Sequence, residues 1–318
     1  MTNSQSMRGL LSSSELRKLS KKSNVKGSLQ LFSHIGAIGL SAIVMSLLIN
    51  TYWFFLVAFI HGVFLNYLYA GQHELSHRTV FTNKRINDLF CSIFGFLTFN
   101  PSKHDLIHHM RHHRYTNNWD KDSELQVRNT YTLGTYLYEL SGVGFWVGRL
   151  KDIISSSKGE IIGYQVSEEN KKTILWEART YLILYMFIFI FSIVNGSWFF
   201  VIYWIGPLLF TKWTHNLHNL IEHTGMAHTS NVLENTRSVD APRWWRWIGW
   251  NMQYHTIHHA FPMIPFHNLA LANEMISEKL GHKPATMGYL EFQIAILKKL
   301  INSPESKWNG ENIIIKNT

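Results

Sequence analysis

The chain has 318 residues, of which 46% are hydrophobic, yet its mean hydropathy of -0.06 is close to neutral. This combination is typical of very apolar segments joined by polar ones, and it excludes a uniformly soluble globule. The net charge of +9 fits a membrane surface or a nucleic acid, while the single cysteine excludes an internal disulfide, an iron–sulfur cluster and a thiolate zinc site.

The N-terminal segment, residues 1–28, is polar and basic. It has no short apolar core of a signal peptide directly after Met1. The segment that follows it is apolar and contains no motif that binds in a nucleic-acid groove. We therefore expect a cytoplasmic flank beside the membrane and no nucleic-acid partner. Its basic residues are Arg8, Arg17, Lys18, Lys21, Lys22 and Lys26.

Four apolar segments follow in two pairs, at about 29–50 and 52–72 and at about 178–195 and 198–214. Each is near the roughly 20 residues that span a bilayer. The short connector within each pair has no Lys or Arg, which predicts that both termini and the middle section are cytoplasmic. We expect an all-α integral membrane protein of about four transmembrane helices in two hairpins. A cytoplasmic helical cap completes a single domain over 29–302, and 303–318 form a polar tail.

Eleven of the 18 histidines lie in four short motifs, HELSH, HHMRHH, HNLIEH and HTIHH, and nine of these eleven have the spacing of metal ligands. Residues at i, i+3 and i+4 share one face of a helix, so each motif directs its imidazoles toward one region. Nine imidazoles are too many for one zinc, which takes about four ligands, and they suit two metal ions. The candidate ligands are His73, His77, His109, His112, His113, His223, His255, His258 and His259.

Other interpretations stay open at this point. HELSH also matches the HExxH signature of zinc proteases, with Glu74 as general base. A metal transporter would need polar or acidic residues along its spans, and these spans have few. His34 and His61 lie within apolar spans and are conceivable haem ligands, but hydrogen-bonded core histidines fit them better.

The boxes HxxxH, HxxHH and HxxHH, in this order around two apolar hairpins, resemble the membrane-bound fatty acid desaturase superfamily, which also contains alkane and sphingolipid hydroxylases. The resemblance covers about Tyr52 to Leu269. It implies two iron ions (Fe2+/Fe3+), O2 as co-substrate, a lipid or acyl substrate, and a separate electron donor of the ferredoxin or cytochrome b5 type with its reductase. In NLIEHTG it implies that His223 binds iron and that Asn219 contacts the metal through water. Acyl-CoA desaturases often use HxxxxH as the first box, so HELSH argues against that branch.

Metal-bound histidines usually donate their second N–H to a carboxylate or carbonyl. Several acids close to the boxes, Asp122 and Glu124 among them, are candidates for this role. We single out Glu74, Asp105, His108, Asp120 and Glu222. The expected location is a bacterial inner membrane. Desaturation is the first expectation, and hydroxylation is the alternative that no motif distinguishes.

Overall fold

The computed structural model describes residues 7, 9–118, 120–124, 132–161 and 165–302. The predicted tail at 303–318 lies outside these residues. Within them the fold is helical, and only two three-residue strands, β1 (Ser238–Asp240) and β2 (Thr286–Gly288), pair in parallel. The all-α prediction is confirmed.

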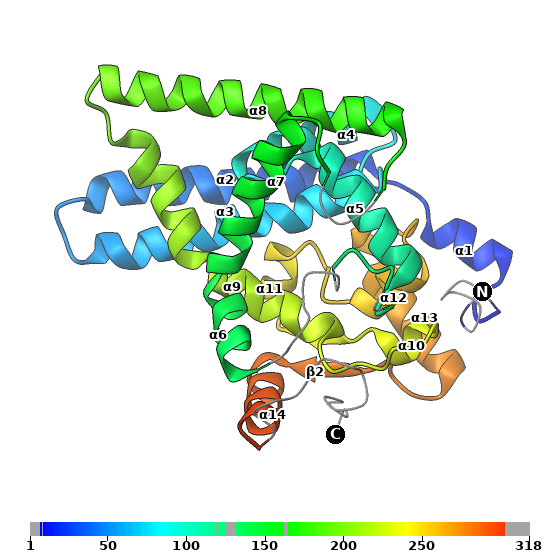
Figure 1. The fold of residues 1–318 in the computed structure, drawn as a ribbon. Helices are drawn as coiled ribbons and strands as arrows, with labels where there is room; N and C mark the ends of the chain where they lie inside the picture. The colour runs from blue at the N-terminus through cyan, green and yellow to red at the C-terminus, as the bar shows by residue number, and fades with distance from the viewer. Residues whose placement is uncertain (1–6, 8, 119, 125–131, 162–164, 303–318) are drawn as a thin grey trace.

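Three helices are long and apolar enough to cross a membrane: α2 (Asn24–Leu48), α3 (Trp53–Ser76) and α8 (Glu168–Val194). Most of the surface of α2 and α8 is exposed and apolar, as a lipid-facing helix requires. Figure 1 shows α2 and α3 as an antiparallel hairpin with α8 running along them, and the connectors after α2 and α8 lie at one end. These features agree with an integral membrane protein.

The fourth apolar segment is less regular than the sequence suggested. It forms a π-helix, Val201–Ile205, that continues into α9 (Gly206–His223). Pro207 has no N–H to donate, and the Gly206 N–H bonds back to the carbonyl of Val201, five residues earlier. A span at 198–214 therefore remains a prediction.

Helix α9 packs closely against α3, and this contact positions two of the histidine motifs. A Cβ at Gly62 would overlap the carbonyl oxygen of Pro207, so only glycine permits this approach. The buried Asn66 amide donates to the carbonyl of Leu208 and to the hydroxyl of Thr211, both at 2.8 Å. Helices α3 and α9 are thus held together about two to three turns before His73 and about three to four turns before His223.

The remaining helices gather at the opposite end from the connectors (Figure 1). They are α4 (Lys84–Leu97), α5 (Ser102–Tyr115), α6 (Leu133–Ser141), α7 (Val143–Ser157), α10 (Val232–Asn235), α11 (Arg243–Ile248), α12 (His255–Ala260), α13 (Leu269–Leu280) and α14 (Tyr289–Asn302), with a short 3-10 helix at Phe266–Asn268.

The N-terminal segment forms part of this end of the protein. Its helix α1 (Ser13–Leu19) begins with a capping box at Ser12 and buries Leu19 in the same core cluster as Ile257 of α12. Lys279 of α13 forms an ion pair with Glu15 at 2.6 Å. The segment that was expected only to flank the membrane therefore also covers a histidine helix.

Candidate metal centre

The nine predicted histidines converge in two groups, each with all its ligand atoms within 4.8 Å of one another. The first group contains five histidines from three helices and the second contains four. The first is His73, His77, His109, His113 and His258; the second is His112, His223, His255 and His259.

Helices α5 and α12 each contribute to both groups. On α5 the i, i+4 pair His109 and His113 belongs to the first group, and His112 belongs to the second. On α12 the assignment is reversed, because His255 and His259 belong to the second group and His258 to the first. Each HxxHH box thus lies between the two groups, which are neighbours in space.

The ring nitrogens that face the centre of each group lie close together. In the first group, the Nε2 atoms of His77 and His109 are 3.1 Å apart. In the second, His223 Nε2 lies 3.2 Å from His112 Nε2 and 2.9 Å from His255 Nε2. Nitrogen lone pairs at this spacing repel one another unless a proton or a cation lies between them.

The opposite nitrogens of the second group have partners on the protein. His112 Nδ1 lies 2.9 and 3.1 Å from the two carboxylate oxygens of Asp122, which accept its hydrogen. His223 Nδ1 donates to the carbonyl of Asn235 at 3.1 Å, and His255 Nδ1 lies 3.0 Å from Glu222. For His112 and His223 these hydrogen bonds place a hydrogen on Nδ1 and leave the Nε2 lone pair facing inward, as a metal ligand requires.

Burial and mutual repulsion keep most of these rings neutral. Burial first, and the neighbouring imidazoles second, hold the pKa values of His109, His113 and His255 well below the usual range. His112 is different. Burial lowers its pKa, but the charges of Asp122 and Glu124 outweigh that effect and raise it to about 9. Neutral, inward-facing imidazoles are the form in which histidine binds a metal.

Buried histidine nitrogens without a hydrogen-bond partner also indicate a metal site. Both ring nitrogens of His73 and the Nε2 of His259 are buried and have no hydrogen-bond partner among the described residues. Buried polar groups are normally satisfied, so an orphan set of this kind needs an explanation. The donor set and its orphan atoms fit a metal centre with histidine ligands.

Two of the predicted supporting residues, Glu74 and Glu222, lie beside the histidine groups. Glu74 and Glu222 lie against ring nitrogens of histidines in the two groups, and the Glu74 carboxylate is 3.5 Å from His258 Nδ1. Glu74 also accepts the N–H of Phe266 at 3.1 Å, so it buttresses the outer side of a ring instead of facing the centre as a protease base would. Asp120 is exposed.

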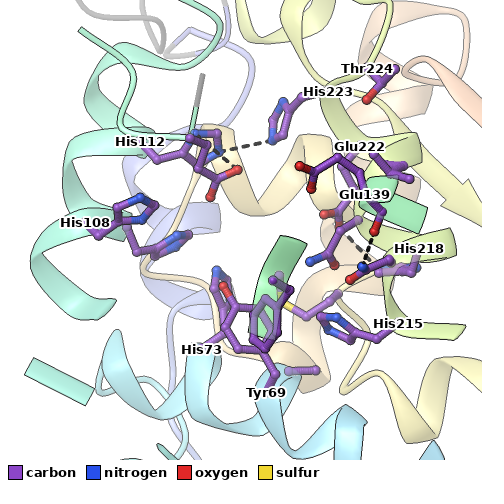
Figure 2. A pocket seen from close by; sticks show the side chains of 18 of the residues that line it. Tyr69, His73, His108, His112, Glu139, His215, His218, Glu222, His223 and Thr224 are labelled. Carbon is purple, nitrogen blue, oxygen red and sulfur yellow. Dashed lines mark hydrogen bonds and ion pairs between the residues drawn. The ribbon is translucent and has the colours of Figure 1, made fainter. Parts of the chain in front are cut away.

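Three further predicted positions lie beside the centre. Asp105 accepts a hydrogen bond from Gln72 at 3.3 Å and lies 3.9 Å from Arg149. His108 and Asn219 line a cavity of about 280 Å³ that adjoins both groups. Figure 2 shows this cavity with His73, His112 and His223 around it.

Sequence reasoning missed the contacts that come from the backbone or from short side chains. The Asn235 carbonyl and the Thr116 hydroxyl, which lies 3.2 Å from His259 Nδ1, had no signal in the sequence. Asp122, which was only one of several acids considered there, takes the position beside His112.

His34 and His61 are hydrogen-bonded core histidines. His34 Nε2 donates to the carbonyl of Phe64 at 2.9 Å, and its Nδ1 accepts from the indole N–H of Trp250 at 3.0 Å. His61 lies 2.8 Å from both the Ser41 hydroxyl and the carbonyl of Tyr203. Both nitrogens of each ring are occupied, which supports the structural role and not haem ligation.

Membrane-length helices that end in a buried, histidine-rich metal-binding centre define a membrane protein of the histidine-box class. A family model described as fatty acid desaturase matches residues 50–291, and the chain belongs to this family. It is therefore an oxidoreductase of the fatty acid desaturase superfamily.

Curated relatives agree with this assignment at low identity. The chain is 24% identical over 253 residues to an sn-1 oleoyl-lipid 12-desaturase of Picosynechococcus sp., which covers 72% of this chain and 71% of the relative. It is 23% identical over 228 residues to a fatty acid desaturase of Bacillus subtilis, covering 66% and 64%. A Delta 8-(E)-sphingolipid desaturase of Lachancea kluyveri is 32% identical over 79 residues, covering 24% and 14%.

Proposed function

We propose that this protein is an O2-dependent di-iron enzyme that desaturates a fatty acyl or lipid chain in the membrane. The observation that carries the proposal is the pair of adjacent all-histidine groups, with five and four candidate ligands. Imidazole is a good ligand for iron, whereas a structural zinc site closes at four ligands and would leave one histidine of the first group unused.

Two irons bound there would supply the oxidising power to remove hydrogen from an unactivated C–H bond, with O2 as co-substrate and two electrons from a donor. The chain's own residues hold and orient the histidines through Asp122, Glu222 and Glu74. In this proposal the walls of the adjoining cavity position the reacting carbon beside the histidine groups. We propose that Asn219, on the cavity wall, contacts the metal through a water molecule.

The electron donor is a separate protein in this proposal, since the sequence has no dinucleotide-binding GxGxxG motif and no CxxC pair. We propose a donor of the ferredoxin or cytochrome b5 type. We propose that the termini and the metal centre lie on the cytoplasmic side, because the connectors within the two predicted hairpins have no Lys or Arg. The bacterial relatives in Picosynechococcus and Bacillus support an inner-membrane location.

Metal analysis and product analysis test the proposal together. We expect about two irons per purified chain, and His113→Ala or His258→Ala should lose iron and turnover while the helix content is retained. His282→Ala, at an exposed histidine just after the end of α13, is the matched control and should behave as wild type. One zinc per chain, or full activity in both ligand variants, would contradict the proposal.

Mass analysis of lipids from cells with and without the protein identifies the reaction. The loss of two hydrogens from an acyl chain is the expected result. The gain of one oxygen would assign a hydroxylase of the same superfamily instead.

A further inference from the structure

Lys212 lies at the cytoplasmic end of the fourth apolar segment and is only 2% exposed. A lysine at such a position usually extends its ammonium into the headgroup region. Here it turns into the protein, where Nζ lies 3.0 Å from His215 Nδ1 and 3.7 Å from the centre of the Phe145 ring. The stem packs against the turn between α6 and α7, with Cγ 2.8 Å from the position a Cβ would take at Gly142.

The charge of Lys212 is not matched by a carboxylate. No acidic oxygen of the described residues lies within 4.0 Å of Nζ. The nearby Asp105 and Asp152 lie 3.9 and 3.8 Å from Arg149, which is their partner. Glu139 also lines the cavity, and its Oε1 lies 3.2 Å from the position a Cβ would take at Gly144. A buried cation without an opposite charge in contact is costly, and a bound anion would offset that cost.

Lys212 and the histidine groups share one cavity. The cavity of about 280 Å³ is lined by Lys212 and Phe145 and also by His73, His109 and His255. Figure 2 shows His215 and His73 on one side of this space and His112 and His223 on another. A single small group in the cavity can therefore approach both the ammonium and the metal centre.

We propose that Lys212 binds an anionic oxygen group of the substrate, a carboxylate or a phosphate, inside this cavity. An ammonium has three N–H donors, and His215 accepts one of them. The other two are available for charge-assisted hydrogen bonds to an anion. The inference rests on the proposed function, and it adds that the anionic group and the oxidised carbon occupy the same cavity.

Binding of a matched series of probes tests this inference without turnover. The full-length protein, purified in a neutral detergent, is titrated with dodecanoate, dodecyl phosphate and the uncharged dodecanol. Nanodiscs of anionic phosphatidylglycerol or zwitterionic phosphatidylcholine form a second arm, which separates an anionic lipid headgroup from a free acid. We expect the anionic probes to bind roughly thirtyfold or more tightly than dodecanol, as a desolvated ion pair allows.

Lys212→Met keeps the length of the side chain and removes the charge. It should bind dodecanol as wild type does and lose the preference for anions. Lys151→Met, at an exposed lysine of α7, is the matched control and should keep the preference.

Equal binding of dodecanol and dodecanoate by wild type would overturn the inference, and so would an unchanged preference in Lys212→Met. If the Lys212→Met protein does not accumulate, the ratio of anion affinity to dodecanol affinity in the wild type tests the inference by itself. A preference seen only with phosphatidylglycerol would assign the site to an anionic lipid headgroup. Iron content and lipid products are measured on the same preparations, so failure of the proposed chemistry would be recognised separately from failure of anion binding.

Discussion

Asp122→Asn tests how strongly the centre depends on its supporting hydrogen bonds. The side chain of Asp122 is 1% exposed and accepts from His112 Nδ1 through both oxygens, at 2.9 and 3.1 Å. One oxygen also accepts the N–H of Asn117 at 2.7 Å, and the other accepts the N–H of Glu124 at 2.9 Å. All these partners are donors, so an amide NH2 in either orientation faces a donor and at least one bond is lost.

Loss of a supporting partner of this kind lowers metal affinity about 10- to 100-fold, which corresponds to roughly 1.4 to 2.8 kcal/mol. We expect the chelator concentration that removes half of the iron to fall by that factor in Asp122→Asn. Asp88→Asn, at an exposed ion pair with Arg78, is the matched control and should not change it. An unchanged chelator midpoint in a folded Asp122→Asn protein would refute the reasoning that Asp122 orients His112.

Two further predictions concern the membrane helices. Gly62→Ala should separate α3 from α9 and sharply lower the melting temperature in detergent, because the added Cβ would overlap the Pro207 carbonyl. Gly36→Ala is the control and should leave the melting temperature unchanged, because no atom lies within 4 Å of the added carbon. Trp250→Phe should destabilise the protein by about 1–3 kcal/mol, since it leaves the buried His34 Nδ1 without its donor. Thermal unfolding measures this loss of stability, and a melting temperature equal to that of the wild type would contradict the prediction.

Helical periodicity made the candidate ligands predictable from the sequence. Spacings of three and four residues place His109, His112 and His113 on one side of a helix whatever the rest of the fold does. The division between the two groups was not predictable, since it depends on how α5 and α12 cross. The contact of His223 with the Asn235 carbonyl likewise exists only after the chain has folded.

Apolar length predicted the membrane-spanning parts of α2, α3 and α8, because each contains an apolar run near the thickness of a bilayer. Helix α8 also extends ten residues before the predicted start at 178, through a charged stretch that begins at Glu168. The fourth segment was harder, as its Pro207 breaks the hydrogen-bond ladder and a π-helix results. Burial of Lys212 was also unforeseen, since a lysine at the end of an apolar run usually faces the headgroups.

The shared helices α5 and α12 have a consequence for how the centre fills with metal. Under the proposed function, an ion bound in either group would fix the position of both helices and thereby prepare the ligands of the other group. The two binding equilibria would then be coupled, and by linkage each ion would strengthen the binding of the other to the same degree. Half-filled protein would then be a minor species during loading.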